Sequence, residues 1–210
     1  MTKYLRYMRH GATELNVADV WQGRADSPLT ELGRRQAAEA GEHIREAGLD
    51  FNYIYCSPRG RVTETLEAAL PDAFARGAYR FDLGLLELSF GDSDGRPHAG
   101  TDPRSPYADY FEGIGGESEA SAEARVCGAA ARFMEADDAR DVLVVSHGTL
   151  GRIFRNHWAA NARVEAPRHL SNCSLYTYEF DEATREFSLV DIFEPASATN
   201  PEDFIPTEPK

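Results

Sequence analysis

The sequence predicts an α/β fold with a largely parallel sheet, because short apolar segments alternate along the chain with segments of helical periodicity. The clearest buried strand is the apolar run at 142–145 (VLVV), and the clearest helix follows Thr30, where apolar residues recur at roughly helical spacing. In sheets of this kind, ligands bind beyond the carboxyl ends of the strands. We therefore expect the functional side chains to follow directly after predicted strands.

The first part of the chain contains three predicted strands and two predicted helices. The strands are residues 4–8, 51–55 and 79–83, and the helices are residues 30–47 and 60–70. Thr30 is a suitable N-cap for the first helix and Gly48 ends it, whereas Pro71 ends the second. Residues 11–21, between the first strand and the first helix, are predicted to form a loop.

The second part begins with a long irregular stretch, residues 91–116, which is rich in Gly, Pro and Asp. It is too long for an ordinary connection, so residues 92–116 are predicted to be a functional loop or a cap over the active site. Helices at 117–136 and 149–160 flank the strand at 142–145, and residues 174–180 and 187–193 form an antiparallel pair around the turn 181–184. We expect one domain, 1–193, and a poorly ordered, acidic, proline-containing tail, 194–210.

Length and composition place the chain among soluble globular proteins. Its 210 residues suffice for a sizeable core, and 42% hydrophobic and 27% charged residues are ordinary values. No apolar stretch is long enough to span a membrane, and Lys3, Arg6 and Arg9 interrupt the first ten residues, which therefore lack the apolar core of a signal peptide. We expect a cytoplasmic location and no membrane association.

Charge and cysteine content exclude several classes of partner. A net charge of -13 would repel nucleic acid over most of the surface, although an arginine cluster can still dominate inside a pocket. The three cysteines are widely spaced and form no CxxC, so they predict neither a disulfide framework nor a zinc site. We interpret Cys56, Cys127 and Cys173 as small apolar residues of the core.

Two histidines indicate one site assembled from distant parts of the chain. His10 and His147 each follow a predicted strand, and each precedes a glycine. A neutral imidazole can attack phosphorus and form a phosphohistidine, which divides one transfer into two easier ones. An isolated histidine at a strand end is more often structural. Arg9 and the matching motif downstream around His147 favour a catalytic role for His10 instead. Gly11 has no side chain and allows the backbone to approach the site closely.

Arginines near these histidines are candidate ligands for phosphate. The guanidinium group of Arg9 offers a rigid fork of donors and stays charged at any working pH, so it would stabilise charge on a transferring phosphoryl group. Arg59 and Arg61 follow the second predicted strand, and position alone does not choose between them. His147 would donate a hydrogen bond to phosphate, and the N-terminus of the helix after it is an anion site through its free N–H groups. Surface or structural roles are expected for the other histidines, which are His43, His98, His157 and His169.

Phosphoryl transfer from an ester also needs a proton donor for the leaving oxygen and a base for water. Glu87 is the preferred candidate because it lies between apolar neighbours, and Asp92 and Asp94 are its rivals. The alternative interpretation is that Glu87 is simply an exposed residue of a strand. A metal site is not expected, since no HxH or HExxH spacing occurs and an adjacent arginine disfavours a cation. The chain also lacks a Walker A loop and a GxGxxG motif, so no nucleotide cofactor is predicted.

Taken together, these residues resemble the histidine phosphatase superfamily, which includes phosphoglycerate mutases and many small-molecule phosphatases. The resemblance extends from Arg9 to about Ser174. A single matching block would be weak evidence for the family, but several blocks in the order typical of the family are strong evidence. The matching blocks are 9–16 (RHGATELN), 21–23 (WQG), 26–30 (DSPLT), 33–37 (GRRQA), 57–65 (SPRGRVTET), 86–91 (LELSFG), 146–148 (SHG) and 172–174 (NCS).

The resemblance implies a phosphohistidine at His10, a phosphate pocket of Arg9, Arg61 and His147, and Glu87 as the proton donor. It selects Arg61 over Arg59. Positions that match substrate-facing residues are Asn16, Gln22, Gly23 and Gly148. It also implies a three-layer α/β/α fold with a mostly parallel central sheet, like that of phosphoglycerate mutases, and neither a metal nor an organic cofactor.

The chain departs from the family pattern at a few positions. Ala12 stands where relatives often carry Glu or Gln, and Asp94 where many carry Glu. The 92–116 loop is short compared with the insertion of glycolytic mutases. The leading hypothesis is therefore a phosphatase that hydrolyses the phosphomonoester of a small metabolite. The alternatives are a mutase, with phosphoglycerate mutase-type phosphoryl transfer, and a non-catalytic phospholigand-binding module. The hairpin-like region 174–193 offers an edge that could pair two copies as a homodimer.

Overall fold

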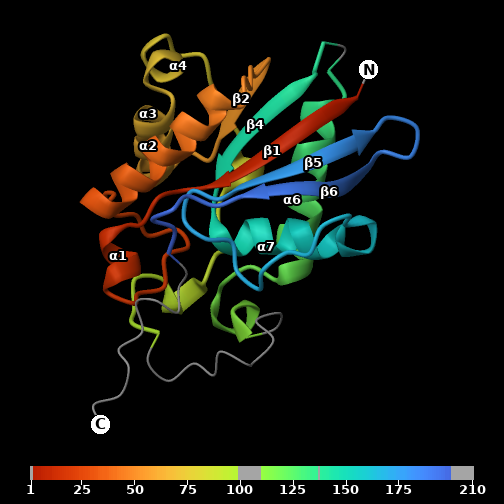
Figure 1. Cartoon of the computed structure of the whole chain (residues 1–210). Helices are drawn as coiled ribbons and strands as arrows, with labels where there is room; N and C mark the ends of the chain where they lie inside the picture. The colour runs from red at the N-terminus through yellow and green to blue at the C-terminus, as the bar shows by residue number, and fades with distance from the viewer. Residues whose placement is uncertain (1, 99–109, 137, 200–210) are drawn as a thin grey trace.

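A six-stranded sheet forms the centre of the protein in a computed structural model that describes residues 2–98, 110–136 and 138–199. The strands lie in the order β3-β2-β4-β1-β5-β6 (Figure 1). Strands β1 to β4 are mutually parallel, whereas β5 runs antiparallel to both β1 and β6. The predicted α/β fold with a mostly parallel sheet is confirmed. The strands are β1 (Lys3–Arg9), β2 (Tyr53–Cys56), β3 (Arg80–Phe81), β4 (Asp141–Ser146), β5 (Leu175–Asp181) and β6 (Glu186–Phe193).

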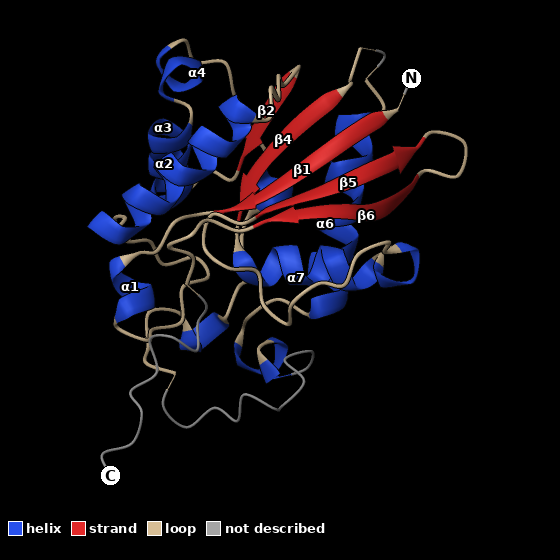
Figure 2. Ribbon diagram, in the orientation of Figure 1, coloured by secondary structure: helices blue, strands red, loops and turns tan. Residues whose placement is uncertain are grey.

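Helices cover both faces of this sheet (Figure 2). One face carries α2 (Glu31–Glu46), α3 (Gly60–Ala69) and α4 (Pro71–Ala75), and the other carries α6 (Glu119–Met134) and α7 (Gly148–His157). Successive residues of β4 point to opposite faces, so Val142 and Val144 join the core under α6 and α7, while Leu143 and Val145 join the core under α2 and α3. This double burial explains the continuous apolar run in the sequence.

The structure differs from the predicted elements where local hydrogen bonds decide the conformation. The predicted loop 11–21 contains a one-turn helix, α1 (Glu14–Val17), because Thr13 and Asn16 form a reciprocal capping box. Pro71 begins a further short helix rather than only ending α3, since proline suits the first helical position. The predicted strand 79–83 contributes only Arg80–Phe81 before the chain turns into the 3₁₀ segment Leu83–Leu85.

The two segments predicted to be irregular are described only in part. The loop 92–116 contains 3₁₀ turns at Gly91–Ser93 and Glu112–Ile114, and residues 99–109 lie outside the described residues. The segment 194–199, which we expected to belong to the tail, is bound to the domain: the Ser197 amide donates to Glu39 Oε2 at 3.0 Å. Residues 200–210 lie outside the described residues.

A search of the described ranges finds no helix that combines the length and the apolar character needed to cross a membrane.

Two glycines allow the segment after β1 to lie directly against the start of α2. A Cβ atom at Gly33 would lie 2.1 Å from the carbonyl oxygen of Ala12, and one at Gly11 would lie 2.5 Å from the carbonyl oxygen of Gly33. Thr30, the N-cap of α2, also donates its hydroxyl proton to Ala12 O at 3.0 Å. The expected close approach at Gly11 is therefore made to α2, which fixes the segment that follows His10.

We predict that Gly33→Ala lowers the free energy of unfolding by about 1–3 kcal/mol, because the new methyl group would overlap backbone atoms that cannot move freely. Gly128→Ala, in the middle of α6, is the matched control. There the nearest heavy atom to an added Cβ is the end of the Arg132 side chain at 4.0 Å, and alanine should stabilise the helix by up to about 1 kcal/mol. Denaturant unfolding measures both, and equal effects of the two substitutions would contradict the account.

Candidate active site

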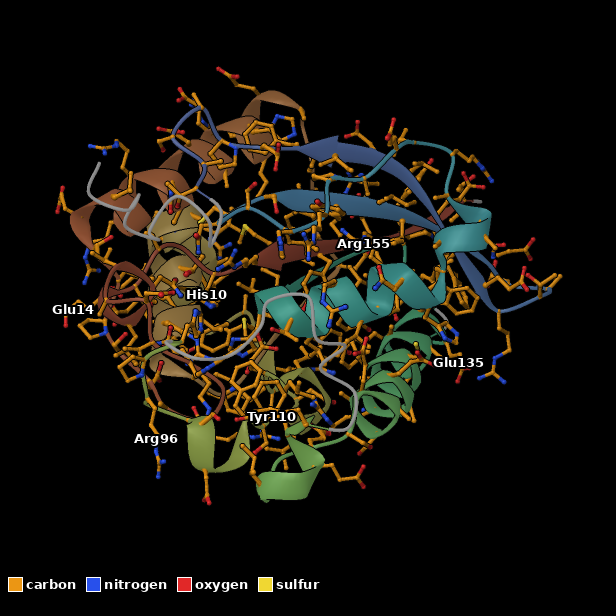
Figure 3. All side chains as sticks on the ribbon, turned by 90° about the horizontal axis from the view of Figure 1, so that it is seen from below. His10, Glu14, Arg96, Tyr110, Glu135 and Arg155 are labelled. Carbon is orange, nitrogen blue, oxygen red and sulfur yellow. The ribbon has the colours of Figure 1, made fainter. Side chains whose placement is uncertain are left out.

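The two motif histidines meet because β1 and β4 are adjacent parallel strands. Arg9 pairs with Ser146 in the ladder, and the backbone N–H of His10 donates to Ser146 O at 3.0 Å. The imidazole rings of His10 and His147 lie edge to face, with their centroids 5.4 Å apart. Figure 3 shows His10 within the molecule near the start of α7, whereas Glu14 and Arg96 lie at the periphery.

The hydrogen bonds of His10 define which ring nitrogen is free. Its Nδ1 lies 2.8 Å from Gly11 O, and a carbonyl oxygen can only accept, so Nδ1 carries the proton and Nε2 keeps its lone pair. Burial, followed by the positive charges of Arg61 and Arg9, lowers the pKa of His10 well below its ordinary value. His10 is thus neutral at neutral pH, which is the form that a nucleophile requires.

His147 is held by protein groups at both ring nitrogens. Arg61 Nη2 donates to Nδ1 at 3.0 Å, so Nε2 carries the proton and donates to Ser57 Oγ at 2.7 Å. The hydroxyl of Tyr7 anchors the backbone by donating to His147 O at 2.9 Å. Burial and the charge of Arg61 lower the pKa of His147 well below its ordinary value. The predicted donation to phosphate would require Nε2–H to exchange Ser57 for the phosphate.

Arg61 is fully buried in a cage of backbone carbonyl groups. Its Nη1 donates to Ala25 O at 2.8 Å and to Asp26 Oδ1 at 2.9 Å, and its Nη2 donates to Gly23 O at 3.0 Å. Its Nε has no hydrogen-bond partner within the described part of the chain. Because a buried donor without an acceptor is costly, this nitrogen is a natural donor to a bound anion.

The loop that supplies these carbonyl groups is fixed by Asp94. The carboxylate of Asp94 accepts hydrogen bonds from the backbone N–H groups of Gly23, Arg24 and Ala25, at 2.9, 2.6 and 3.1 Å. Asp94, one of the other candidates for the proton donor, therefore holds this loop. Asp92, the second of them, is exposed. Asp94 acts on Arg61 by placing the carbonyl groups that bind it.

Arg9, the residue before His10, is also buried. Its Nη1 donates to Leu170 O at 2.5 Å, whereas its Nε has no partner among the described residues. Burial lowers the pKa of Arg9 to about 10, so it remains charged at neutral pH. Gly148 leaves room for this side chain, because a Cβ at Gly148 would lie 2.9 Å from Arg9 Nε. The structure thus gives Gly148 a clear packing role.

Glu87 occupies the N-terminus of α7. Its Oε1 accepts from the N–H groups of Leu88 at 2.9 Å and Leu150 at 2.8 Å, and its Oε2 accepts from Thr149 at 3.0 Å. The expectation that this helix terminus is open to phosphate is therefore wrong for Thr149 and Leu150, whose N–H groups are taken by a carboxylate of the chain itself. The same contacts hold Glu87 beside the start of the helix that follows His147.

The remaining residues predicted to face substrate make contacts within the surrounding loops. Gln22 Oε1 accepts from Thr13 Oγ1 at 2.7 Å, and Gln22 Nε2 donates to Ser27 Oγ at 3.0 Å. Asn16 Oδ1 accepts from the N–H of Thr13 at 3.2 Å. Gly23 supplies a carbonyl group to Arg61.

A hydrogen-bonded network that the sequence did not indicate holds the segment after β1. Ala12 N–H donates to Gln36 Oε1 at 2.9 Å, and Asn172 Nδ2 donates to His10 O at 2.9 Å. Thr199 joins the two amides: its Oγ1 accepts from Gln36 Nε2 at 3.0 Å and donates to Asn172 Oδ1 at 3.1 Å. Asn172 and Gln36 belonged to matching blocks, but the sequence indicated no role for either, and nothing in it marked Thr199.

Comparison with known proteins identifies the family of this chain. The sequence profile of the histidine phosphatase superfamily (branch 1) matches residues 5–192, and the chain belongs to this superfamily.

Relatives carry both mutase and phosphatase names. The chain is 32% identical over 184 residues to the protein named "Probable phosphoglycerate mutase GpmB" of Salmonella paratyphi A, with 84% of each chain covered. Among solved structures, YhfR of Bacillus stearothermophilus superposes with a TM-score of 0.74 at 25% identity, covering 95% of this chain and 98% of that one. A mycobacterial glucosyl-3-phosphoglycerate phosphatase in complex with VO3 superposes with a TM-score of 0.71 at 26% identity, covering 92% and 100%.

We predict that Thr199→Val accelerates amide hydrogen exchange in residues 10–13 by about 5-fold, because it removes two hydrogen bonds that tie Gln36 to Asn172. Thr199→Ser, which keeps the hydroxyl, should restore the original rate. Thr184→Val, in the turn between β5 and β6, is the control. Unchanged protection in Thr199→Val would contradict a role for Thr199 in holding this segment.

The lowered pKa values of His10 and His147 predict a loss of stability in acid. Both are neutral in the folded protein, whereas in the unfolded chain they bind protons near pH 6.5. The unfolded state then binds more protons, so the free energy of unfolding should fall as the pH drops below about 6.5, by up to about 1.4 kcal/mol per pH unit for each histidine.

Chemical denaturation between pH 7 and pH 5 measures this slope. His10→Gln should reduce the slope, because it removes one of the two groups, and Thr184→Val, which removes no titratable group, should leave it unchanged. The same slope in the wild type and in His10→Gln would show that His10 is not held neutral.

Proposed function

We propose that the protein is a phosphatase that hydrolyses a small-molecule phosphomonoester through a phosphohistidine at His10. The observation that carries the proposal is a neutral nucleophile beside unsatisfied cations: His10 Nε2 has a free lone pair, and the buried Nε atoms of Arg9 and Arg61 have no acceptor among the described residues. A phosphate dianion would supply acceptors for both guanidinium groups.

In the first step, His10 Nε2 attacks phosphorus, a P–N bond forms, and the bond from phosphorus to the ester oxygen breaks. Glu87 delivers a proton to the leaving oxygen, and the alcohol departs. Arg9 and Arg61 stabilise the negative charge on the transferring phosphoryl group, because their charges are fixed in position and shielded from water.

In the second step, water attacks the phosphohistidine and Glu87 accepts its proton. The P–N bond breaks, inorganic phosphate leaves, and His10 returns to the neutral tautomer with the proton on Nδ1. The bond from Nδ1–H to Gly11 O serves both steps, since it holds the ring orientation while Nε2 gains and loses phosphorus.

The test is hydrolysis of p-nitrophenyl phosphate. We expect turnover in the wild type and a loss of about 10³-fold or more in His10→Ala, with His157→Ala as the control. In Glu87→Gln, an acid-labile phosphoryl group on His10 should accumulate and be detectable by mass spectrometry. Absence of turnover, or equal rates in wild type and His10→Ala, would overturn the proposal.

The names of the curated relatives favour one alternative, a phosphoglycerate mutase-type transfer in which the phosphoryl group returns to a reoriented product. The two reactions share the site and differ in whether water reaches the phosphohistidine. Incubation with 3-phosphoglycerate separates them: we expect release of inorganic phosphate, whereas 2-phosphoglycerate formed in excess over phosphate would identify a mutase.

A further inference from the structure

Two arginines beside the site take no part in this mechanism. Arg59 is the N-cap of α3, and its guanidinium group donates no hydrogen bond to any residue that the structure describes; its Nε is buried. Arg24 lies in the loop that encloses Arg61, and its side chain is 33% exposed.

Both arginines sit on loops that contact each other at the site. The loop of Arg24 gives the carbonyl oxygen of Gly23 to Arg61 at 3.0 Å, and the Gly60 N–H, next to Arg59, donates to Asp26 Oδ2 at 2.5 Å. Ser57, two residues before Arg59, accepts the proton of His147 Nε2 at 2.7 Å. Arg24 and Arg59 therefore each lie next to a residue through which these two loops contact each other.

The carboxylates near these arginines are already engaged elsewhere. Glu117 accepts two hydrogen bonds from Arg125, at 2.9 and 2.8 Å. Its Oε2 lies farther from Arg24, at 3.7 Å from Nη2. Asp26 binds Arg61, and Glu87 binds the amides of α7. Burial lowers the pKa of Arg24 and of His147, and the positive charge of Arg59 is a smaller cause of both shifts. One carboxylate, Glu117, thus serves both Arg24 and Arg125, and the Nε of Arg59 has no acceptor among the described residues. The positive charge that remains calls for an anion from outside the chain.

We propose that Arg24 and Arg59 form a second anion-binding site beside the phosphate pocket, which selects phosphomonoesters whose organic part carries a further anionic group. This inference rests on the proposed function. The loop of Arg24 reaches the phosphate pocket through the Gly23 carbonyl group that binds Arg61, and the loop of Arg59 reaches it through Ser57, which binds His147. A carboxylate on the organic part of a bound phosphomonoester would meet the planar forks of these two guanidinium groups.

A pair of compounds that differ only in this group tests the inference. 3-Phosphoglycerate carries a carboxylate where glycerol 3-phosphate carries a hydroxymethyl group. We would measure the inhibition constant of each against hydrolysis of p-nitrophenyl phosphate by the wild type, Arg24→Gln and Arg59→Gln. Arg35→Gln is the matched control, because it removes the same charge from the exposed face of α2.

The wild type and Arg35→Gln should bind 3-phosphoglycerate about 10-fold or more tightly than glycerol 3-phosphate. Each of the two site variants should reduce that ratio several-fold, whereas Arg35→Gln should leave both the ratio and kcat/KM for p-nitrophenyl phosphate unchanged. A ratio near one in the wild type would overturn the inference. So would equal losses on both compounds, since the arginines would then serve the transferred phosphate.

Failure of the proposed function is a separate outcome. If the wild type did not hydrolyse p-nitrophenyl phosphate, the phosphatase proposal would fall. Calorimetric titration of the same two compounds would still show whether Arg24 and Arg59 discriminate between them, with a ratio near one again overturning the second site.

Discussion

Two guanidinium groups buried at the carboxyl ends of the central strands set the constraint on which the site depends. Arg9 and Arg61 are held away from water next to two imidazole rings, so protonation of either ring would place a further positive charge in the same poorly solvated space. Both histidines are therefore neutral, and the hydrogen bond to Gly11 leaves the lone pair of His10 on Nε2. The same positive charge makes the pocket a site for phosphate, although the chain as a whole is strongly acidic.

The fold keeps the charge of Arg61 in place with backbone carbonyl groups and one carboxylate, that of Asp26. The carbonyl groups around Arg61 accept its hydrogen bonds without cancelling its positive charge, as a second carboxylate would. Asp94 fixes the loop that carries these carbonyl groups by accepting hydrogen bonds from its backbone N–H groups. Gln36 and Asn172 bind the backbone around His10, and Thr199 links these two side chains. The reactive groups are therefore positioned by backbone contacts from four distant parts of the chain.

The sequence predicted those features that local pattern or strand position determines. The VLVV run of β4 and the Thr30 cap of α2 follow from burial and capping, and the placement of His10 beside His147 follows from the rule that parallel strands present their carboxyl ends together. The choice of Arg61 over Arg59 came from the family resemblance, and the structure gives Arg61 a carbonyl cage that Arg59 lacks. The features that were missed depend on tertiary contacts. Glu87 reaches the N-terminus of α7 from 62 residues away, and Thr199 reaches Gln36 from 163 residues away, so no local pattern could reveal either.

The most direct test of the central claim is the protonation state of His10, read from the nitrogen chemical shifts of ¹⁵N-labelled imidazole at pH 7. The account predicts a neutral ring with the proton on Nδ1 and a free lone pair on Nε2, together with a His147 ring that carries its proton on Nε2. Assignment follows from the spectrum of His10→Gln. An imidazolium at His10 at pH 7, or a neutral ring with the proton on Nε2, would contradict the claim that buried arginines and the Gly11 carbonyl group prepare His10 as a nucleophile.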